Sequence, residues 1–198
     1  MPEGIKAGER DVSAYKLKRK QAFAHSSVGV FTISVVVIGA VPIPFSDSAL
    51  LAPVEIAEIN LVAQIYGIKK DQMSKQFVDS ILQVGVVTAA AKTAISFLKA
   101  IPGINLAASL INSIIAGTII ALLGEGCIYI FEQIYLGEKS IDDVDWVTKV
   151  MEAKFTNQFM DIIKKISESI TENMDKDTII KIIGGIMKEF SDRNLVKK

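Results

Sequence analysis

Residues 104–136 read INLAASLINSIIAGTIIALLGEGCIYIFEQIYL, and only Glu125 and Glu132 among them carry a charge. The run contains no proline, and Gly137 follows it as a helix-ending residue. We therefore predict one long helix over residues 104–136. A segment this poor in charge must be kept from water, either inside a tightly packed helical bundle or by a membrane.

The flanking sequence divides into further helices. Residues 71–99 are predicted as the preceding helix, with Asp71 as its cap, and Pro102 and Gly103 then turn the chain back. Together with residues 104–136, this helix would form a long apolar antiparallel hairpin. Other helices are predicted over residues 12–39, about 50–66, 142–170 and 177–190. The predicted fold class is all-α, a helical bundle.

A second break separates the first two predicted helices. Pro42 and Pro44 supply no backbone N–H, and each disfavours helical geometry in the residue before it. Asp47 follows them and can cap the next helix. We therefore expect residues 42–47 to form a hinge or a re-entrant turn between apolar helices.

Small residues recur every four positions on both helices of the predicted hairpin. They are Gly85, Ala89 and Thr93 on the first helix, and Ser109, Ser113 and Gly117 on the second. Small residues at this spacing let two helix backbones approach closely. The alternative is a chance recurrence in alanine-rich helices. The spacing favours close packing between these two faces.

Composition and charge exclude several classes of protein. Of the 198 residues, 50% are hydrophobic, and the mean hydropathy is +0.38, so disorder is excluded for most of the length. The 22 basic and 22 acidic residues balance, which argues against nucleic-acid binding. Cys127 and His25 are the only residues of their types, and they provide neither a disulfide framework nor a zinc-type ligand pair. The polar start of the chain does not predict a secretory signal.

The sequence contains no motif for catalysis or nucleotide binding. A phosphate-binding loop requires the pattern Gly-x-x-x-x-Gly-Lys-Ser/Thr, which occurs nowhere in the chain. His25 has no cysteine, serine or carboxylate at a spacing that indicates catalysis. We therefore expect a protein without catalytic, cofactor-binding or metal-binding residues, and without a cofactor.

Charged residues within the apolar regions are the candidates for a polar site. In residues 21–68 the only charges are Asp47, Glu55 and Glu58. Glu55 and Glu58 share a face of one predicted helix, so they could form a paired-carboxylate or cation site. The alternative is a helix cap and one polar helix face. Glu125 and Glu132 also share a face, which either lines a polar seam or meets solvent.

Two uncharged stretches are long enough to cross a membrane. Residues 26–46 and 100–124 carry no charged side chain, and each exceeds the roughly 20 residues that span the hydrocarbon core. A basic cluster, KLKRK at residues 16–20, precedes the first stretch, as is typical of the cytoplasmic side of a membrane. Prolines and polar residues lower the apolar density of both stretches. From these residues alone, a soluble bundle is an equal alternative.

Two blocks of the sequence resemble a known family. The first block is AVPIPFSD at residues 40–47, with Leu50-Leu51 and then IYG at residues 65–67. The second is IPG at residues 101–103, with Gly124-Glu125 and the aromatic pair Tyr129 and Phe131. This double block resembles the YcjF-related domain family of unknown function, over roughly residues 15–138. The resemblance implies a helical domain of the kind found C-terminal to small bacterial Ras-like GTPases and in inner-membrane proteins.

The resemblance sets the expected domain division and function. We expect an apolar helical domain over residues 1–138, with amphipathic helices over residues 139–198 packed on it or appended to it. The expected function is that of a non-enzymatic module that acts with a GTPase partner, in cis or in trans, and contacts membrane lipid through residues 26–45 and 104–124. The expected location is the cell inner membrane or its cytoplasmic face.

Two other classes of protein fit the same sequence. One is a soluble cytoplasmic helical bundle with a structural or lipid-binding role. The other is a pore-forming or translocator protein that inserts into a membrane after folding in water. The sequence leaves the oligomeric state open.

Overall fold

The computed structural model describes residues 3–39, 51–101, 108–171, 174 and 176–196. Within these ranges every regular element is helical, and no strand occurs, so the predicted all-α helical bundle is confirmed. The α-helices are α1 (Glu3–Gly39), α2 (Ala52–Tyr66), α3 (Lys75–Leu82), α4 (Val84–Lys99), α5 (Ala108–Tyr135), α6 (Val144–Glu168) and α7 (Lys176–Val196), and a 3-10 helix, η2, covers Lys70–Gln72. The predicted hinge and turn residues Pro42, Pro44, Asp47, Pro102 and Gly103 lie outside the described residues.

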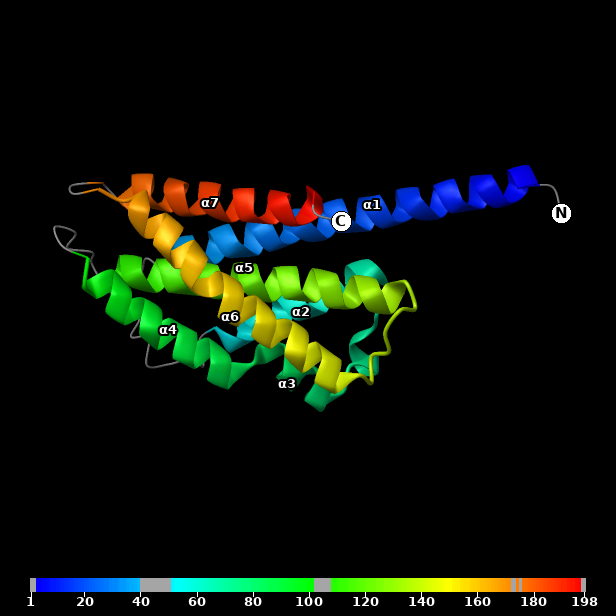
Figure 1. Ribbon diagram of the computed structural model, residues 1–198, viewed down its shortest axis with the longest axis horizontal. Coiled ribbons are helices and arrows are strands. Elements are labelled where there is room, and N and C mark those ends of the chain that lie inside the picture. The colour runs from blue at the N-terminus through cyan, green and yellow to red at the C-terminus, as the bar shows by residue number, and fades with distance from the viewer. Residues whose placement is uncertain (1–2, 40–50, 102–107, 172–173, 175, 197–198) are drawn as a thin grey trace.

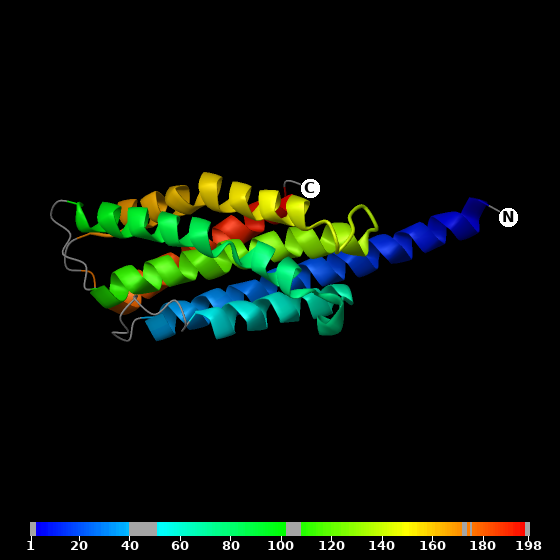
Figure 2. The ribbon, with the colours of Figure 1, turned by 90° about the horizontal axis from the view of Figure 1, so that it is seen from below.

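The long helices run in alternating directions along one axis (Figure 1). α5 lies in the middle, between α4 and α6 on one side and α1 and α2 on the other (Figure 2). It contacts every other α-helix, and its most extensive contact is with α1. The N-terminal part of α1 extends beyond the rest of the bundle (Figure 1).

α5 occupies the centre because its sequence is apolar on all sides. Every residue from Ser113 to Ile128 is buried. A helix of this kind has no polar face to turn toward water, so it must be covered on all sides. The predicted hairpin partner, α4, covers only part of it, and the remaining sides are covered by α1, α2, α3, α6 and α7.

α6 shows how the outer helices cover α5. Its buried side chains recur every three or four positions, as predicted for an amphipathic helix over residues 142–170. They include Val147, Met151, Phe155, Phe159, Ile162 and Ile166. These residues and those of α7 belong to the same apolar cluster as the buried residues of α1 and α5. α6 and α7 therefore pack into the same core as α1 and α5.

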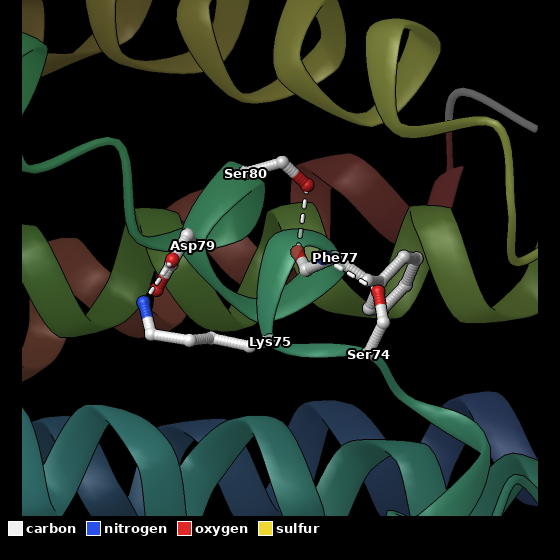
Figure 3. Close-up of polar contacts among 5 residues, drawn as sticks. All are labelled: Ser74, Lys75, Phe77, Asp79 and Ser80. Carbon is white, nitrogen blue, oxygen red and sulfur yellow. Dashed lines mark hydrogen bonds and ion pairs between the residues drawn. The ribbon is translucent and has the colours of Figure 1, made fainter.

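The prediction of one helix over residues 71–99 is wrong. The helix is divided at Gln83, which adopts a left-handed backbone conformation with φ of +45°. Asp71 lies in the short 3-10 helix, and the cap is instead Ser74, whose Oγ accepts a hydrogen bond from the backbone N–H of Phe77 at 3.1 Å (Figure 3). The Gln83 side-chain amide donates to the carbonyl of Ser80 at 2.8 Å, which satisfies a backbone acceptor at the end of α3.

The prediction that the small residues of α4 and α5 pack against each other is also wrong, because α1 rather than α4 approaches the small residues of α5. Gly85 and Ala89 are exposed, and a Cβ atom on Gly85 would have no neighbour within 4 Å. Ser113 and Gly117 are buried and Ser109 is partly buried. The close approach at Gly117 is made by Val36 of α1. The spacing of the small residues identified the face of α5 on which they lie. The side chain that approaches Gly117 on this face is Val36, which belongs to a helix distant in sequence.

Candidate functional site

A row of polar side chains, all buried except the partly buried Gln21, lies where α1, α2 and α5 meet. We call it the polar seam, and its members are Gln21, His25, Glu58, Glu125 and Glu132. Nδ1 of His25 on α1 lies 2.8 Å from Oε1 of Glu125 on α5, and both residues are buried. The Gln21 amide, one helical turn before His25, donates to Oε2 of Glu132 at 3.0 Å. The seam thus joins α1 to the two acidic residues of α5.

Glu58 is the member of the seam contributed by α2. Its exposed fraction is 0%, and neither carboxyl oxygen has a hydrogen-bond partner among the described residues. Burial raises the pKa of Glu58 well above its ordinary value, and the charges of Glu55 and Glu125 raise that pKa further. An unpaired charge in such surroundings is strongly unfavourable. The Glu58 carboxyl group is therefore protonated and neutral while α2 packs against α5.

Gly124 provides the space for this carboxyl group. A Cβ atom at position 124 would lie 2.6 Å from Oε1 of Glu58 and 2.5 Å from Cγ2 of Val28. Both distances are far shorter than a van der Waals contact. The Gly124-Glu125 pair therefore has two roles: the glycine admits Glu58 of α2 and Val28 of α1, and the glutamate contacts His25.

The sequence predicted Glu55 and Glu58 as a possible polar site, and their environments differ. Glu58 is fully buried against α5, whereas Glu55 is partly exposed. Burial raises the pKa of Glu55 to about 7. Among the described residues, no group of three or more His, Cys, Asp or Glu side chains is placed to hold a metal ion.

The seam has no arrangement suited to nucleophilic catalysis. Cys127 is fully buried on α5, and burial raises its pKa well above its ordinary value. A buried thiol of this kind stays protonated and is a poor nucleophile. The chemistry that the seam supports is the binding and release of a proton at Glu58.

A second candidate site is an exposed apolar stripe on α1. We call it the α1 outer face, and it consists of Phe23, Val30, Ile33 and Val37. Phe23, Val30 and Val37 are exposed to 61%, 63% and 52%, and each is seven residues from the next, which places them on one side of the helix. No charged Asp, Glu, Lys or Arg occurs from position 21 to position 37. The stripe is about 21 Å long at 1.5 Å per residue.

The basic cluster of residues 16–20 precedes the α1 outer face on the same helix. Lys16, Lys18 and Arg19 are exposed, and the Arg19 guanidinium lies 5.9 Å from the centre of the Tyr15 ring. Lys20 turns inward, where its amine donates to the carbonyl of Ile65 and lies 5.0 Å from the centre of the Tyr135 ring. α1 therefore presents a basic surface followed by an apolar one.

Among the residues that the structure describes, two segments are long and apolar enough to cross a membrane. One is Lys75–Lys99, which comprises α3 and α4, and the other is α5. Length and composition are the only basis for this statement, and α5 is enclosed by the rest of the bundle. A core helix of a soluble protein has the same properties.

Sequence reasoning found some members of the seam and missed others. The spacing of Glu125 and Glu132 indicated a shared face, and their place in an otherwise apolar helix is a signal for a polar seam. His25 was missed because its partner is 100 positions away. Gln21 has no distinguishing pattern in the sequence.

Comparison with protein families gives one match. Residues 9–155 match the family described as a domain of unknown function (DUF697). The match extends past residue 138, where the resemblance stopped, and includes the first part of α6. No curated protein and no solved structure matches the chain.

Proposed function

The chain belongs to the DUF697 family of domains of unknown function, and we propose that it is a non-enzymatic helical module that binds a membrane surface and acts with a GTPase partner. The proposed location is the cytoplasmic face of the inner membrane. The partner domain would be joined in cis or bound in trans.

The membrane part of the proposal depends on the exposure of the α1 outer face. Four large apolar side chains on one side of one helix lie in water without a covering element among the described residues. Contiguous exposed apolar surface of this kind marks an interaction site. The basic residues that precede it would lie among anionic headgroups while the apolar face enters the acyl boundary, the pattern of a helix lying in the membrane interface.

α5 is assigned to the core rather than to the membrane. The sequence suggested lipid contact by residues 104–124, but those from Ser113 onward are buried by other helices. To reach lipid, α5 would have to leave all of its protein contacts. Membrane contact is therefore proposed through the α1 outer face, which overlaps the predicted segment 26–45 but also includes Phe23. Residues 40–45 of that segment lie outside the described residues.

Flotation with vesicles of anionic lipid, without detergent, tests the membrane part. The wild-type chain should float with the vesicles and should be released by alkaline carbonate, because α1 lies on the surface rather than across the bilayer. Val30→Asp should lower the partition coefficient about tenfold, equivalent to about 1.4 kcal/mol. Val30 is exposed, so its replacement should leave the bundle folded.

Ala153→Asp on α6 is the matched control, since Ala153 is exposed on a helix that lies across α5 from α1 (Figure 2). It should bind vesicles like the wild-type chain. If both variants lost vesicle binding equally, or if the wild-type chain did not float, the proposal that the α1 outer face binds the membrane would be contradicted. Resistance to carbonate would indicate an embedded helix instead.

The GTPase part rests on the family resemblance and on the absence of a phosphate-binding loop from the sequence. Chemical crosslinking in cells, followed by identification of the crosslinked peptides, tests it separately. Crosslinks to a Ras-like GTPase domain would support the proposal. Crosslinks that reach only other classes of protein would contradict this part and leave the membrane part unaffected.

A soluble structural or lipid-binding bundle is the second candidate, and the enclosure of α5 favours it. Such a protein would stay in the aqueous fraction during flotation. Mass spectrometry of organic extracts would then find a lipid in the purified chain if the role is lipid binding, and none if it is structural.

A further inference from the structure

α2 is docked on α1 and α5 through a face that contains one carboxyl group. The buried residues of this face are Glu58, Ile59, Val62, Ala63 and Tyr66. Ile59, Val62 and Ala63 gain from burial, because they remove apolar surface from water. Glu58 gains nothing when ionised, since neither of its carboxyl oxygens has a hydrogen-bond partner among the described residues.

Among the described residues, the charged and titratable groups around Glu58 offer it no cation. On its own helix the neighbour is Glu55, and on α5 the neighbours are Glu125 and Cys127. The nearby groups of α1 are engaged elsewhere: His25 with Glu125, and Lys20 with the carbonyl of Ile65. Only the neutral, protonated form of Glu58 is therefore compatible with the docked position.

We propose that α2 docks on the α1–α5 pair only while Glu58 holds its proton, so that loss of this proton releases α2 from the bundle. Release would move the Glu58 carboxylate into water and uncover the space beside Gly124 that it occupies. Release would also leave one side of α5 uncovered, whereas the contacts of α5 with α3, α4, α6 and α7 do not involve α2 and would remain. This inference is independent of the proposed function.

The direction of the pH dependence follows from proton linkage. In released α2, Glu58 has its ordinary pKa of 4.5, and in docked α2 its pKa is well above that value. Docking is therefore most stable below pH 4.5 and weakens as the pH rises toward the docked pKa. One proton lost on release changes the docking equilibrium about tenfold per pH unit in this interval. Glu55 adds a second proton only up to about pH 7, its pKa in the docked helix.

Amide hydrogen exchange on the full chain without membranes tests the proposal, with protection factors corrected for the pH dependence of intrinsic exchange, from about pH 5 to about pH 8. In the wild-type chain the protection of α2 should fall as the pH rises from about 5, by up to about tenfold per pH unit for each of Glu58 and Glu55 that loses its proton on release, while the protection of α6 stays constant. Glu58→Gln, which has nearly the same shape and no titrating group, should remove the part of the fall that Glu58 causes and leave a shallower fall below about pH 7, which Glu55 causes.

Glu55→Gln is the matched control on the same helix, and it should keep the part of the fall that Glu58 causes. Constant protection of α2 in the wild-type chain would overturn the proposal. The same slope in wild type and Glu58→Gln would also overturn it, because another group would then be responsible. A parallel fall in α6 would count against it too, since the whole bundle would then unfold rather than release α2. If a variant fails to fold, the wild-type series still distinguishes release of α2 from its retention.

Discussion

Replacement of Phe131 by Ala is expected to lower the free energy of unfolding by about 3–5 kcal/mol. Phe131 is 0% exposed on α5, and its ring centre lies 5.9 Å from that of Phe77 on α3. The substitution removes the largest type of apolar side chain in this core and leaves a cavity. Because α5 is enclosed on all sides, the surrounding helices cannot collapse into that cavity without losing other contacts.

Urea denaturation followed by far-UV circular dichroism measures this effect. Leu136→Ala is the control, since Leu136 is an exposed apolar residue just beyond the end of α5, and it should change the stability by no more than about 0.5 kcal/mol. Similar losses in the free energy of unfolding for the two variants would mean that water reaches Phe131, as it would in a bundle that does not enclose α5.

Replacement of Gly124 by Ala is expected to destabilise the protein by about 2 kcal/mol. The added Cβ would lie 2.5 Å from one methyl carbon of Val28 and 2.6 Å from the other. A valine in a helix has one strongly preferred rotamer and cannot rotate away. The Glu58 carboxyl group on the other side is equally confined. This crowding exceeds the gain of up to about 1 kcal/mol that alanine brings to a helix interior.

Two other glycines serve as matched controls in the same denaturation experiment. At Gly126 the added Cβ would meet only the flexible end of Met151, which can move aside, so Gly126→Ala should destabilise less than half as much. At Gly29, in the interior of α1, the Cβ would meet nothing within 4 Å. Gly29→Ala should therefore stabilise the protein by about 0.5–1 kcal/mol. Equal changes in the free energy of unfolding at all three positions would contradict the crowding predicted at Gly124.

Local sequence was enough to predict most of the helices and the character of their faces. The apolar stripe of α6, the stop at Gly67 with its φ of +86°, and the absence of charge from most of α5 are local properties. They depend on spacing along the chain, because helical periodicity alone places residues on faces. The division at Gln83 was not predictable in this way, since the residue in the left-handed conformation is not a glycine, and the nearby Gly85 lies inside α4.

What each face contacts depends instead on how the helices pack together. An apolar helix such as α5 can have the same sequence pattern whether it lies in lipid or in a protein core. Its location depends on whether other helices cover it. In the same way, the sequence could not pair Glu125 with His25 or place Glu58 against Gly124, because these contacts join segments far apart in the chain. Periodicity gives the direction in which a side chain leaves its own helix, whereas its partner is selected by the packing of all the helices.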